Sequence, residues 1–107
     1  MWNEPTAQEL SRIPGLYQTD HILIPDTIIH MHFFIGGCDW YVAEFDGEDM
    51  FFGYAVLHGD LGNAEWGYYS LAELQSINIR GLEVDRDLHW QPVPFGDIPG
   101  IGVRYDE

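Results

Sequence analysis

The clearest pattern in the chain is an alternation of apolar and polar residues over Thr27–Leu57. Alternation with a period of two is typical of strands that bury one face. Two short breaks, Gly36-Gly37 and Asp46-Gly47-Glu48-Asp49, divide the stretch, and consecutive glycines accept the positive φ of a two-residue type I′ turn. The pattern therefore predicts three antiparallel strands joined by two tight turns, with Ile35 opposite Cys38.

This register separates the stretch into two faces. One face is almost wholly apolar and is the predicted core, and its members are Ile29, Met31, Phe33, Ile35, Cys38, Trp40, Val42, Phe51, Gly53, Ala55 and Leu57. The other face mixes aromatic and polar residues, namely His30, His32, Phe34, Asp39, Tyr41, Phe45, Met50, Phe52, Tyr54 and Val56. Because this mixed face is too apolar to stand in water, we expect the tail, the first helix, a second subunit or a ligand to cover it.

Two segments are typical of helix starts. Thr6 with Glu9, and Ser70 with Glu73, each have the spacing of a capping box, in which a hydroxyl and a carboxylate cap the first turn reciprocally. Pro14-Gly15 ends the first helix early, and the second helix is predicted over about residues 70–78. Residues 64–69 and 88–91 are predicted as further strands, and 92–107 as a Pro/Gly-rich extended tail.

These elements predict one α+β domain over residues 1–107, because a chain of this length leaves no room for two domains. We expect a four- to five-stranded, mainly antiparallel sheet packed by one main helix at about 70–78. Residues 1–15 are expected to form an N-terminal extension that carries a short helix.

Charge changes this picture more than any motif does. The chain has 18 Asp and Glu against four Arg and no Lys, which gives a formal net charge of −14. Such a field repels nucleic acid and anionic membranes and attracts cationic partners. The single cysteine, Cys38, excludes an internal disulfide, and the sequence contains no secretion signal and no membrane-spanning run. We therefore expect a cytoplasmic protein that contacts neither nucleic acid nor membrane directly.

Five blocks of the sequence have counterparts in a known family. They are Pro14–Tyr17, Trp40–Asp46, Phe51–Tyr54, Gly67–Leu74 and Val84–Pro94, and they occur in the family's order. On these blocks the chain resembles the bacterial family called domain of unknown function 2958, whose members are typically encoded on plasmids, phages and integrated mobile elements. The resemblance implies no established activity. The chain departs from the family pattern in its N-terminal extension, in the two histidines of its first strand and in a longer loop at 58–64.

Three clusters have residue types that could carry chemistry. His30 and His32 point the same way along a strand, and with Asp39 across the hairpin they are candidate zinc or nickel ligands. The carboxylates of the second turn could hold calcium or magnesium, but their spacing is not that of an EF-hand loop. The segment Asp85–His89 would place two carboxylates and a histidine on one strand face as an acid–base group. We favour a structural role for all three clusters and expect no cofactor.

The leading hypothesis is an acidic, non-enzymatic protein-binding module of a plasmid- or phage-type element. It would engage a cationic protein surface, for example as a nucleic-acid mimic that inhibits or modulates a host DNA-binding or defence protein. The candidate binding carboxylates are Glu44, Asp46, Glu48, Asp49, Asp60, Glu65, Asp85 and Asp87. One alternative is a homodimeric structural or accessory domain that uses an aromatic face of Tyr41, Phe52 and Tyr54. Another is a small metal-dependent enzyme centred on His30 and His32.

Overall fold

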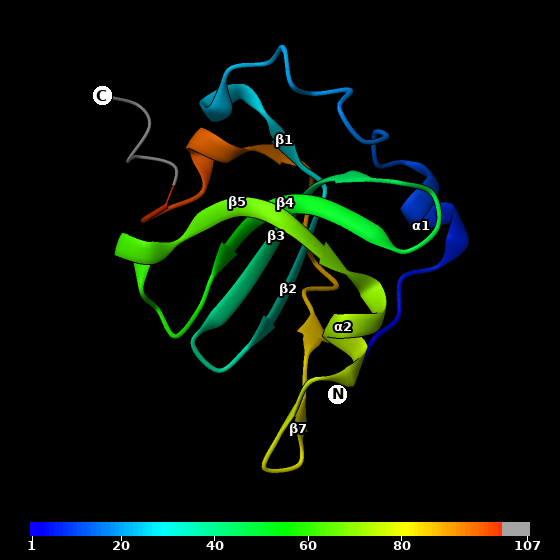
Figure 1. The fold of residues 1–107 in the computed structure, drawn as a ribbon, viewed down its shortest axis with the longest axis vertical. Helices are drawn as coiled ribbons and strands as arrows, with labels where there is room; N and C mark the ends of the chain where they lie inside the picture. Colours follow the sequence, from blue (N-terminus) through cyan, green and yellow to red (C-terminus); the bar gives the residue numbers. More distant parts are fainter. Residues whose placement is uncertain (102–107) are drawn as a thin grey trace.

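The computed structural model describes residues 1–101, which are organised around a five-stranded sheet (Figure 1). All its strands are antiparallel, in the order β5-β4-β3-β2-β8. They are β2 (Met31–Ile35), β3 (Cys38–Phe45), β4 (Met50–Val56), β5 (Glu65–Ser70) and β8 (Asp85–Arg86). The two α-helices are α1 (Ala7–Ser11) and α2 (Leu71–Ser76). The predicted α+β class with an antiparallel sheet is therefore confirmed.

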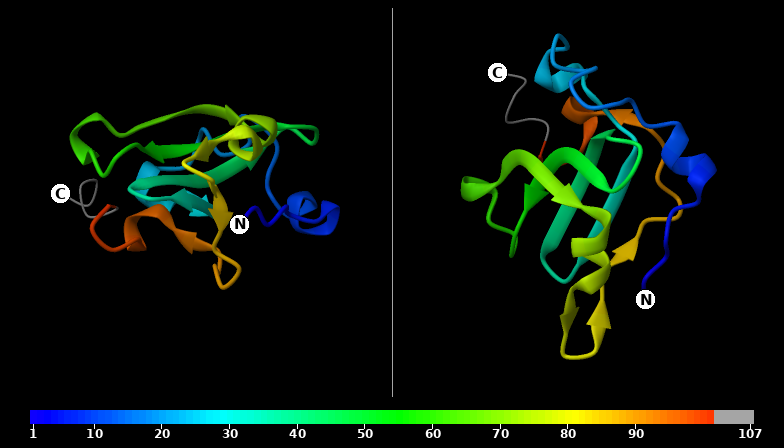
Figure 2. Two further views of the ribbon diagram at one scale, coloured as in Figure 1. Left: turned by 90° about the horizontal axis from the view of Figure 1, so that it is seen from below. Right: turned by 45° about the vertical axis from the view of Figure 1, so that its right-hand side comes forward.

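Smaller elements flank this sheet. They are η1 (Ile24–Asp26), β1 (Ile28–Ile29), η2 (Leu61–Asn63), β6 (Asn78–Ile79), β7 (Leu82–Glu83), β9 (Val93–Pro94) and η3 (Phe95–Asp97). β1 pairs with β9 and β6 pairs with β7. Figure 2 shows the C-terminal segment with β9 and η3 packed against the sheet. None of the helices in residues 1–101 is long and apolar enough to cross a membrane.

The register of the first hairpin is the predicted one. Ile35 pairs with Cys38, and Gly36 has a φ of +54° in the turn between them. In the next pair of strands, Gly53 of β4 lies opposite Val42 of β3. The predicted register is therefore correct, but the predicted type I′ turn is not: only Gly36 has a positive φ, as in a type II′ turn.

The end of β3 differs from the prediction. The pairing of β3 with β4 shifts register between Val42 and Glu44, as it does at a β-bulge. One extra residue exchanges the faces of everything that follows it in the strand. Phe45, predicted on the mixed face, therefore lies in the core, and Glu44 lies on the opposite face.

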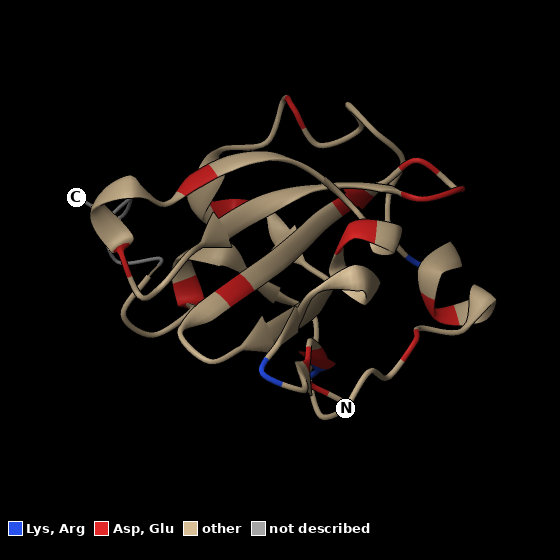
Figure 3. Ribbon diagram, turned by 60° about the horizontal axis from the view of Figure 1, so that its bottom comes forward, with Lys and Arg blue, Asp and Glu red and all other residues tan. Residues whose placement is uncertain are grey.

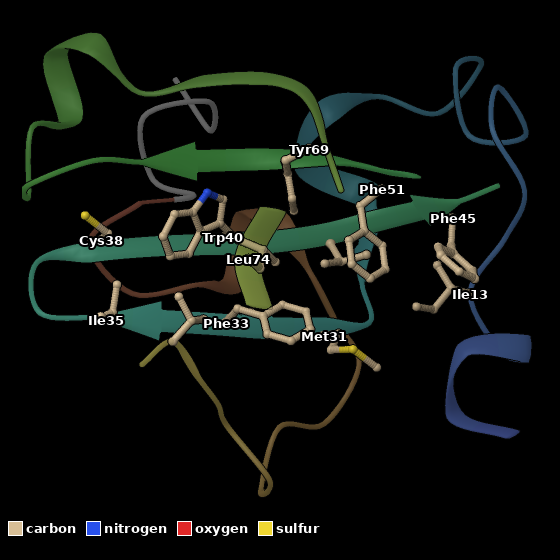
Figure 4. Close-up of a cluster of buried hydrophobic side chains, with 12 residues drawn as sticks. Ile13, Met31, Phe33, Ile35, Cys38, Trp40, Phe45, Phe51, Tyr69 and Leu74 are labelled. Carbon is tan, nitrogen blue, oxygen red and sulfur yellow. The ribbon is translucent and has the colours of Figure 1, made fainter. Parts of the chain in front are cut away.

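The first core fills the space between the sheet, α2 and the end of the α1 segment (Figure 4). Its buried members are Ile13, Met31, Phe33, Ile35, Cys38, Trp40, Val42, Phe45, Phe51, Tyr69, Leu74 and Val84. Leu74 from α2 and Ile13 from the N-terminal segment meet strand residues here. Leu57 was predicted in this core but lies beyond the end of β4 and is 51% exposed.

A second core lies on the mixed face of the sheet. Phe95 of η3 is fully buried there, with its ring centroid 4.9 Å from that of Tyr54 in an edge-to-face arrangement. Ile98 and Ile101 join it from the same C-terminal segment. The indole of Trp90 donates a hydrogen bond of 3.0 Å to the carbonyl of Ile29. The chain's own C-terminal segment, one of the four expected covers, therefore covers the part of this face that holds Tyr41, Tyr54 and Val56.

Two further predictions about strands are corrected by the structure. Ile29 was predicted in the first core but belongs to the second, because the chain leaves the sheet at His30 between β1 and β2. The predicted last strand at 88–91 is not formed, since Leu88 and His89 make a turn, and β8 supplies the fifth strand instead. The chain also makes an unpredicted β6–β7 hairpin, in which Gly81 has a φ of +85°.

The N-terminal helix is tied to the sheet by an ion pair. Thr6 and Glu9 form the predicted capping box at the start of α1. The guanidinium of Arg86 then donates to both carboxylate oxygens of Glu9, at 3.1 and 3.3 Å. The hydrogen bond from the Thr6 backbone, followed by the contribution of Arg86, holds the pKa of Glu9 below its usual value.

Replacing Glu9 with glutamine should therefore have a pH-dependent effect on stability. A depressed carboxyl pKa stabilises the folded state above the unfolded pKa near 4.5, and this stabilisation is lost as the pH falls through the folded pKa. Glutamine keeps the cap but not the charge, so at pH 7 we expect a loss of about 1 kcal/mol, or roughly 4–8 °C in Tm. The difference should disappear in acid, and the control Glu4→Gln, an exposed residue, should change Tm little at any pH. A pH-independent difference for Glu9→Gln would contradict this role.

Candidate functional site

Seven of the eight predicted surface carboxylates fall into three groups around the sheet; Figure 3 shows all Asp and Glu residues of the described chain in red. The β3–β4 turn carries one group and the segment after β4 carries another, so these two lie at opposite ends of β4. At about 3.3 Å per strand residue, they are roughly 20 Å apart. The third group lies on and beside the edge strand β8. In chain order the groups are Asp46, Glu48 and Asp49, then Asp60 and Glu65, then Asp85 and Asp87.

The carboxylate of Asp46 is fixed by the turn that it helps to form. Its Oδ1 accepts hydrogen bonds from the backbone N–H groups of Glu48, Asp49 and Met50, at 2.8, 2.9 and 3.0 Å. These bonds hold the pKa of Asp46 below its usual value, the bond from Glu48 contributing most. Asp49 is likewise fixed, because it accepts from the N–H of Ala72 at 3.0 Å. This turn therefore presents charges in set positions.

Asp60 and Asp85 are held in a similar way. Asp60 accepts from the side chain of Asn63 at 2.6 Å, which is the main reason that the pKa of Asp60 is lowered. Asp85 accepts from the side chain of Asn3 at 2.6 Å, and this bond is the main cause of its lowered pKa. Both groups stay ionised across the physiological pH range.

Positive charge is scarce on the surface of residues 1–101. Arg86 is used internally by its pair with Glu9, which leaves Arg12 and Arg80 as exposed arginines in the described chain. Glu48 and Glu65 are exposed, and their side chains accept no hydrogen bond from another residue of this part of the protein. The described surface is therefore strongly anionic.

Glu44 does not belong to this surface. It was predicted among the exposed binding carboxylates, but the β3 bulge turns it into the protein, where it is 3% exposed. Its Oε1 accepts from the N–H of Tyr17 at 2.9 Å, and its Oε2 accepts from the N–H of Thr19 at 3.0 Å and from the Thr19 hydroxyl. The carboxylate thereby fastens the 15–20 segment to the sheet.

A pocket of about 330 Å³ lies beside Glu44. The 17–24 segment forms one wall and side chains from β4 and β5 form the other. Its lining residues are Tyr17, Thr19, Asp20, Ile22, Ile24, Thr27, Glu44, Phe52, Trp66 and Tyr68. The site therefore combines a buried carboxylate with four aromatic rings. The sequence analysis did not predict that these residues lie together.

The predicted aromatic face is divided by the fold. Tyr41 and Tyr54 are buried in the second core, where the C-terminal segment covers them. Phe52 is half-buried and lines the Glu44 pocket instead. The three residues therefore do not form the exposed surface that the homodimer hypothesis requires, and that hypothesis loses its proposed interface.

The predicted metal ligands are only partly brought together. His32 Nε2 lies 2.7 Å from Asp39 Oδ1, and the ring of His32 stacks on Tyr41 with centroids 4.6 Å apart. His30 lies outside the strand and lines a separate hollow with Trp90, where burial lowers its pKa. Within residues 1–101 no group of three or more His, Cys, Asp or Glu side chains is arranged to hold a metal ion. The predicted His30–His32–Asp39 site is therefore not formed.

The segment Asp85–His89 does not form the acid–base group either. Asp85 is engaged by Asn3, whereas Asp87 accepts from the backbone N–H of His89 at 3.0 Å and lies 4.0 Å from His32 Nδ1. These contacts are structural, because the carboxylates point to different partners and no strand places them on a common face with His89.

Comparison with known proteins gives one match. A family model described as "Protein of unknown function (DUF2958)" matches residues 15–94, most of the chain. The chain belongs to the DUF2958 family. No curated protein and no solved structure matches it. All ten residues that line the Glu44 pocket lie within the DUF2958 match, whereas Phe95, Ile98 and Ile101 of the covering segment lie beyond it.

The sequence blocks that resemble the family also contribute residues to the pocket. Four of the sequence blocks that carry the resemblance each supply one lining residue: Tyr17, Glu44, Phe52 and Tyr68. These blocks are far apart in the chain, and the fold gathers them at one pocket. The DUF2958 segment therefore contains the whole of this site.

Proposed function

We propose that this DUF2958 protein is an acidic, non-enzymatic binding module that engages a cationic protein surface in the bacterial cytoplasm. The observation that carries the proposal is the near absence of exposed positive charge within residues 1–101 of a chain whose net charge is −14. Such a surface accelerates encounter with a basic partner and disfavours acidic ones.

The fixed carboxylates support this proposal further. An exposed acidic side chain that moves freely loses conformational entropy when it binds, which reduces the net gain from a charged contact. Asp46 and Asp60 are already held by hydrogen bonds, so they would lose less. Preorganised charges at both ends of β4 are thus better suited to binding than the same number of mobile ones.

A nucleic-acid mimic is the specific form of this function that we favour. A mimic presents carboxylates where phosphates would lie in the arginine-rich groove of a DNA-binding protein. Separate acidic groups on one rigid sheet, at opposite ends of β4, suit a partner that contacts several phosphates. For a protein encoded by a mobile element, a host DNA-binding or defence protein would be such a partner.

Neutralising carboxylates at both ends of β4, two of them fixed and two of them not, should release the partner. We expect the variant Asp46→Asn, Glu48→Gln, Asp60→Asn, Glu65→Gln, which moves the net charge from −14 to −10, to bind about 100-fold more weakly. Asparagine preserves the caps, so folding is retained. The measurement is capture of proteins from a bacterial lysate on immobilised wild type and variant, with and without an excess of duplex DNA, which should displace the partner of a mimic.

A matched control separates position from net charge. The variant Glu4→Gln, Asp26→Asn, Glu83→Gln, Asp97→Asn also removes four exposed charges, but none from the three groups. It should retain most of the captured partner. Equal loss in both variants would assign binding to net charge alone, and failure of duplex DNA to compete would contradict the mimic.

A further inference from the structure

The Glu44 pocket holds a buried carboxylate without a positive partner. All three groups that bond to Glu44 are uncharged donors from Tyr17 and Thr19, and within residues 1–101 no cationic group lies within ion-pair distance of it. Buried charges in proteins are usually paired, because desolvation is costly. Oε1 accepts a single hydrogen bond, so it retains a free acceptor position. The pocket thus offers an unmet acceptor to a cation.

Aromatic rings surround this acceptor. The rings of Phe52 and Trp66 are stacked with centroids 5.9 Å apart, and the ring of Tyr68 lies 5.1 Å from that of Phe52. The face of an aromatic ring attracts a cation by about 0.5–2 kcal/mol, more when the site is desolvated. The walls would therefore favour a positive group over a neutral one of the same size.

The exposed rings of Tyr17 and Tyr68 lie at the mouth of the pocket. Tyr17 has a φ of +68°, a strained conformation for a residue other than glycine, and is 68% exposed. The nearby side chain of Tyr17 is the main reason that the pKa of Tyr68 is raised. Burial, and then electrostatic interaction with Tyr17, Glu44 and Asp20, raise the pKa further. The carboxylates of Asp20 and Glu44 both line the pocket, so its entrance is negative.

Resting on the proposed function, we propose that the Glu44 pocket receives one arginine side chain of the cationic protein partner. The guanidinium would donate to Oε1 of Glu44, and its plane and aliphatic stem would pack on Trp66 and Tyr68. A volume of 330 Å³ is at the low end for small-molecule sites, which suits a single inserted side chain. Arginine fits better than lysine because its planar head both stacks on rings and donates to a carboxylate.

Other occupants fit less well. An anion would be repelled by Glu44 and Asp20, and an apolar side chain would leave the carboxylate buried and unpaired. A second copy of this chain would have to supply one of the exposed arginines Arg12 and Arg80. That arrangement predicts self-association in solution, which sedimentation would detect.

The test is an NMR titration with arginine blocked at both ends. Bound arginine should shift the indole N–H of Trp66 and the amides of Tyr17 and Thr19, which donate to Glu44. The other three tryptophans, Trp2, Trp40 and Trp90, do not line the pocket and serve as internal controls. Blocked citrulline, a neutral analogue of arginine, should bind at least about tenfold more weakly, because charged hydrogen bonds are the stronger ones. Blocked lysine should fall between the two.

Variants complete the experiment. Tyr68→Ala removes one exposed wall and should weaken arginine binding without loss of folding, whereas Glu44→Gln should abolish the preference for arginine over citrulline. Because Glu44 also fastens the 15–20 segment, Asp20→Asn provides a second charge variant at an exposed position. Equal binding of citrulline and arginine, shifts that avoid Trp66, or a self-associated protein would overturn the inference. If arginine caused no shifts at the pocket but capture of the partner from lysate was still weakened by salt and by duplex DNA, only this inference would fail and the proposed function would stand. If arginine bound but the partner was not captured, the proposed function would be rejected.

Discussion

Replacing Gly53 with alanine is expected to lower the free energy of unfolding by about 3 kcal/mol or more, because overpacking a well-filled site forces backbone to move. A Cβ at this position would lie 2.0 Å from the carbonyl oxygen of Tyr41 and 2.5 Å from the hydroxyl of Tyr69. The nearer atom belongs to the backbone of β3, close to the bulge, and the Tyr69 ring is packed in the first core. Neither the Tyr41 backbone nor the Tyr69 side chain can move aside without a large cost in free energy.

Gly67 provides a matched control. It is the cross-strand partner of Gly53, and a Cβ at Gly67 would meet nothing within 4 Å. Gly67→Ala should therefore change the free energy of unfolding by less than about 1 kcal/mol. Urea unfolding followed by tryptophan fluorescence measures both variants. A Gly53→Ala protein as stable as Gly67→Ala would show that β3 and β4 are not as close as described.

Replacing Phe95 with alanine should cost about 3–5 kcal/mol, the usual range for removing a fully buried phenylalanine. Its ring centroid is 4.9 Å from those of both Tyr54 and Trp66, so the substitution would open the second core. The newly exposed aromatic surface should also promote self-association, which sedimentation velocity at increasing concentration would detect.

The same substitution at Phe34 is the control for the loss of stability and the self-association expected of Phe95→Ala. Phe34 is half-buried in β2 and contacts the ring of His32 rather than the C-terminal segment. Phe34→Ala should cost clearly less, about 1–2 kcal/mol, and should leave the protein monomeric. If Phe95→Ala behaved like Phe34→Ala, the C-terminal segment would not be the cover of the mixed face.

Much of the sheet could be predicted because its signals are local. The Gly36-Gly37 turn and the alternation on either side determine the pairing of Ile35 with Cys38. The bulge was missed because alternation carries no mark of an extra residue. A signal did exist: strict alternation after Val42 would place Glu44 on the core face, and a charge there conflicts with burial unless the register shifts.

The candidate site could not be predicted because it is built from non-local parts. The 17–24 segment, which forms one wall of the pocket, has no hydrophobic period. Trp66 lines the pocket because β5 pairs with β4, and this pairing is not evident from the local sequence. The covering segment left a faint signal, since Phe95, Ile98 and Ile101 recur every three residues in a stretch rich in proline and glycine. That spacing marks one buried side, but it does not reveal which surface the segment covers.

The most direct test of the proposed cationic partner is the salt dependence of the affinity. The Kd for the protein captured from the lysate would be measured by titration calorimetry between about 0.1 and 1 M salt, over which the Debye length falls from roughly 10 to 3 Å. We predict that binding of the wild-type protein weakens by at least about 100-fold, and that the four-carboxylate variant shows a smaller change. A Kd that stays constant over this range, with equal values for wild type and variant, would contradict an acidic surface that binds a cationic partner.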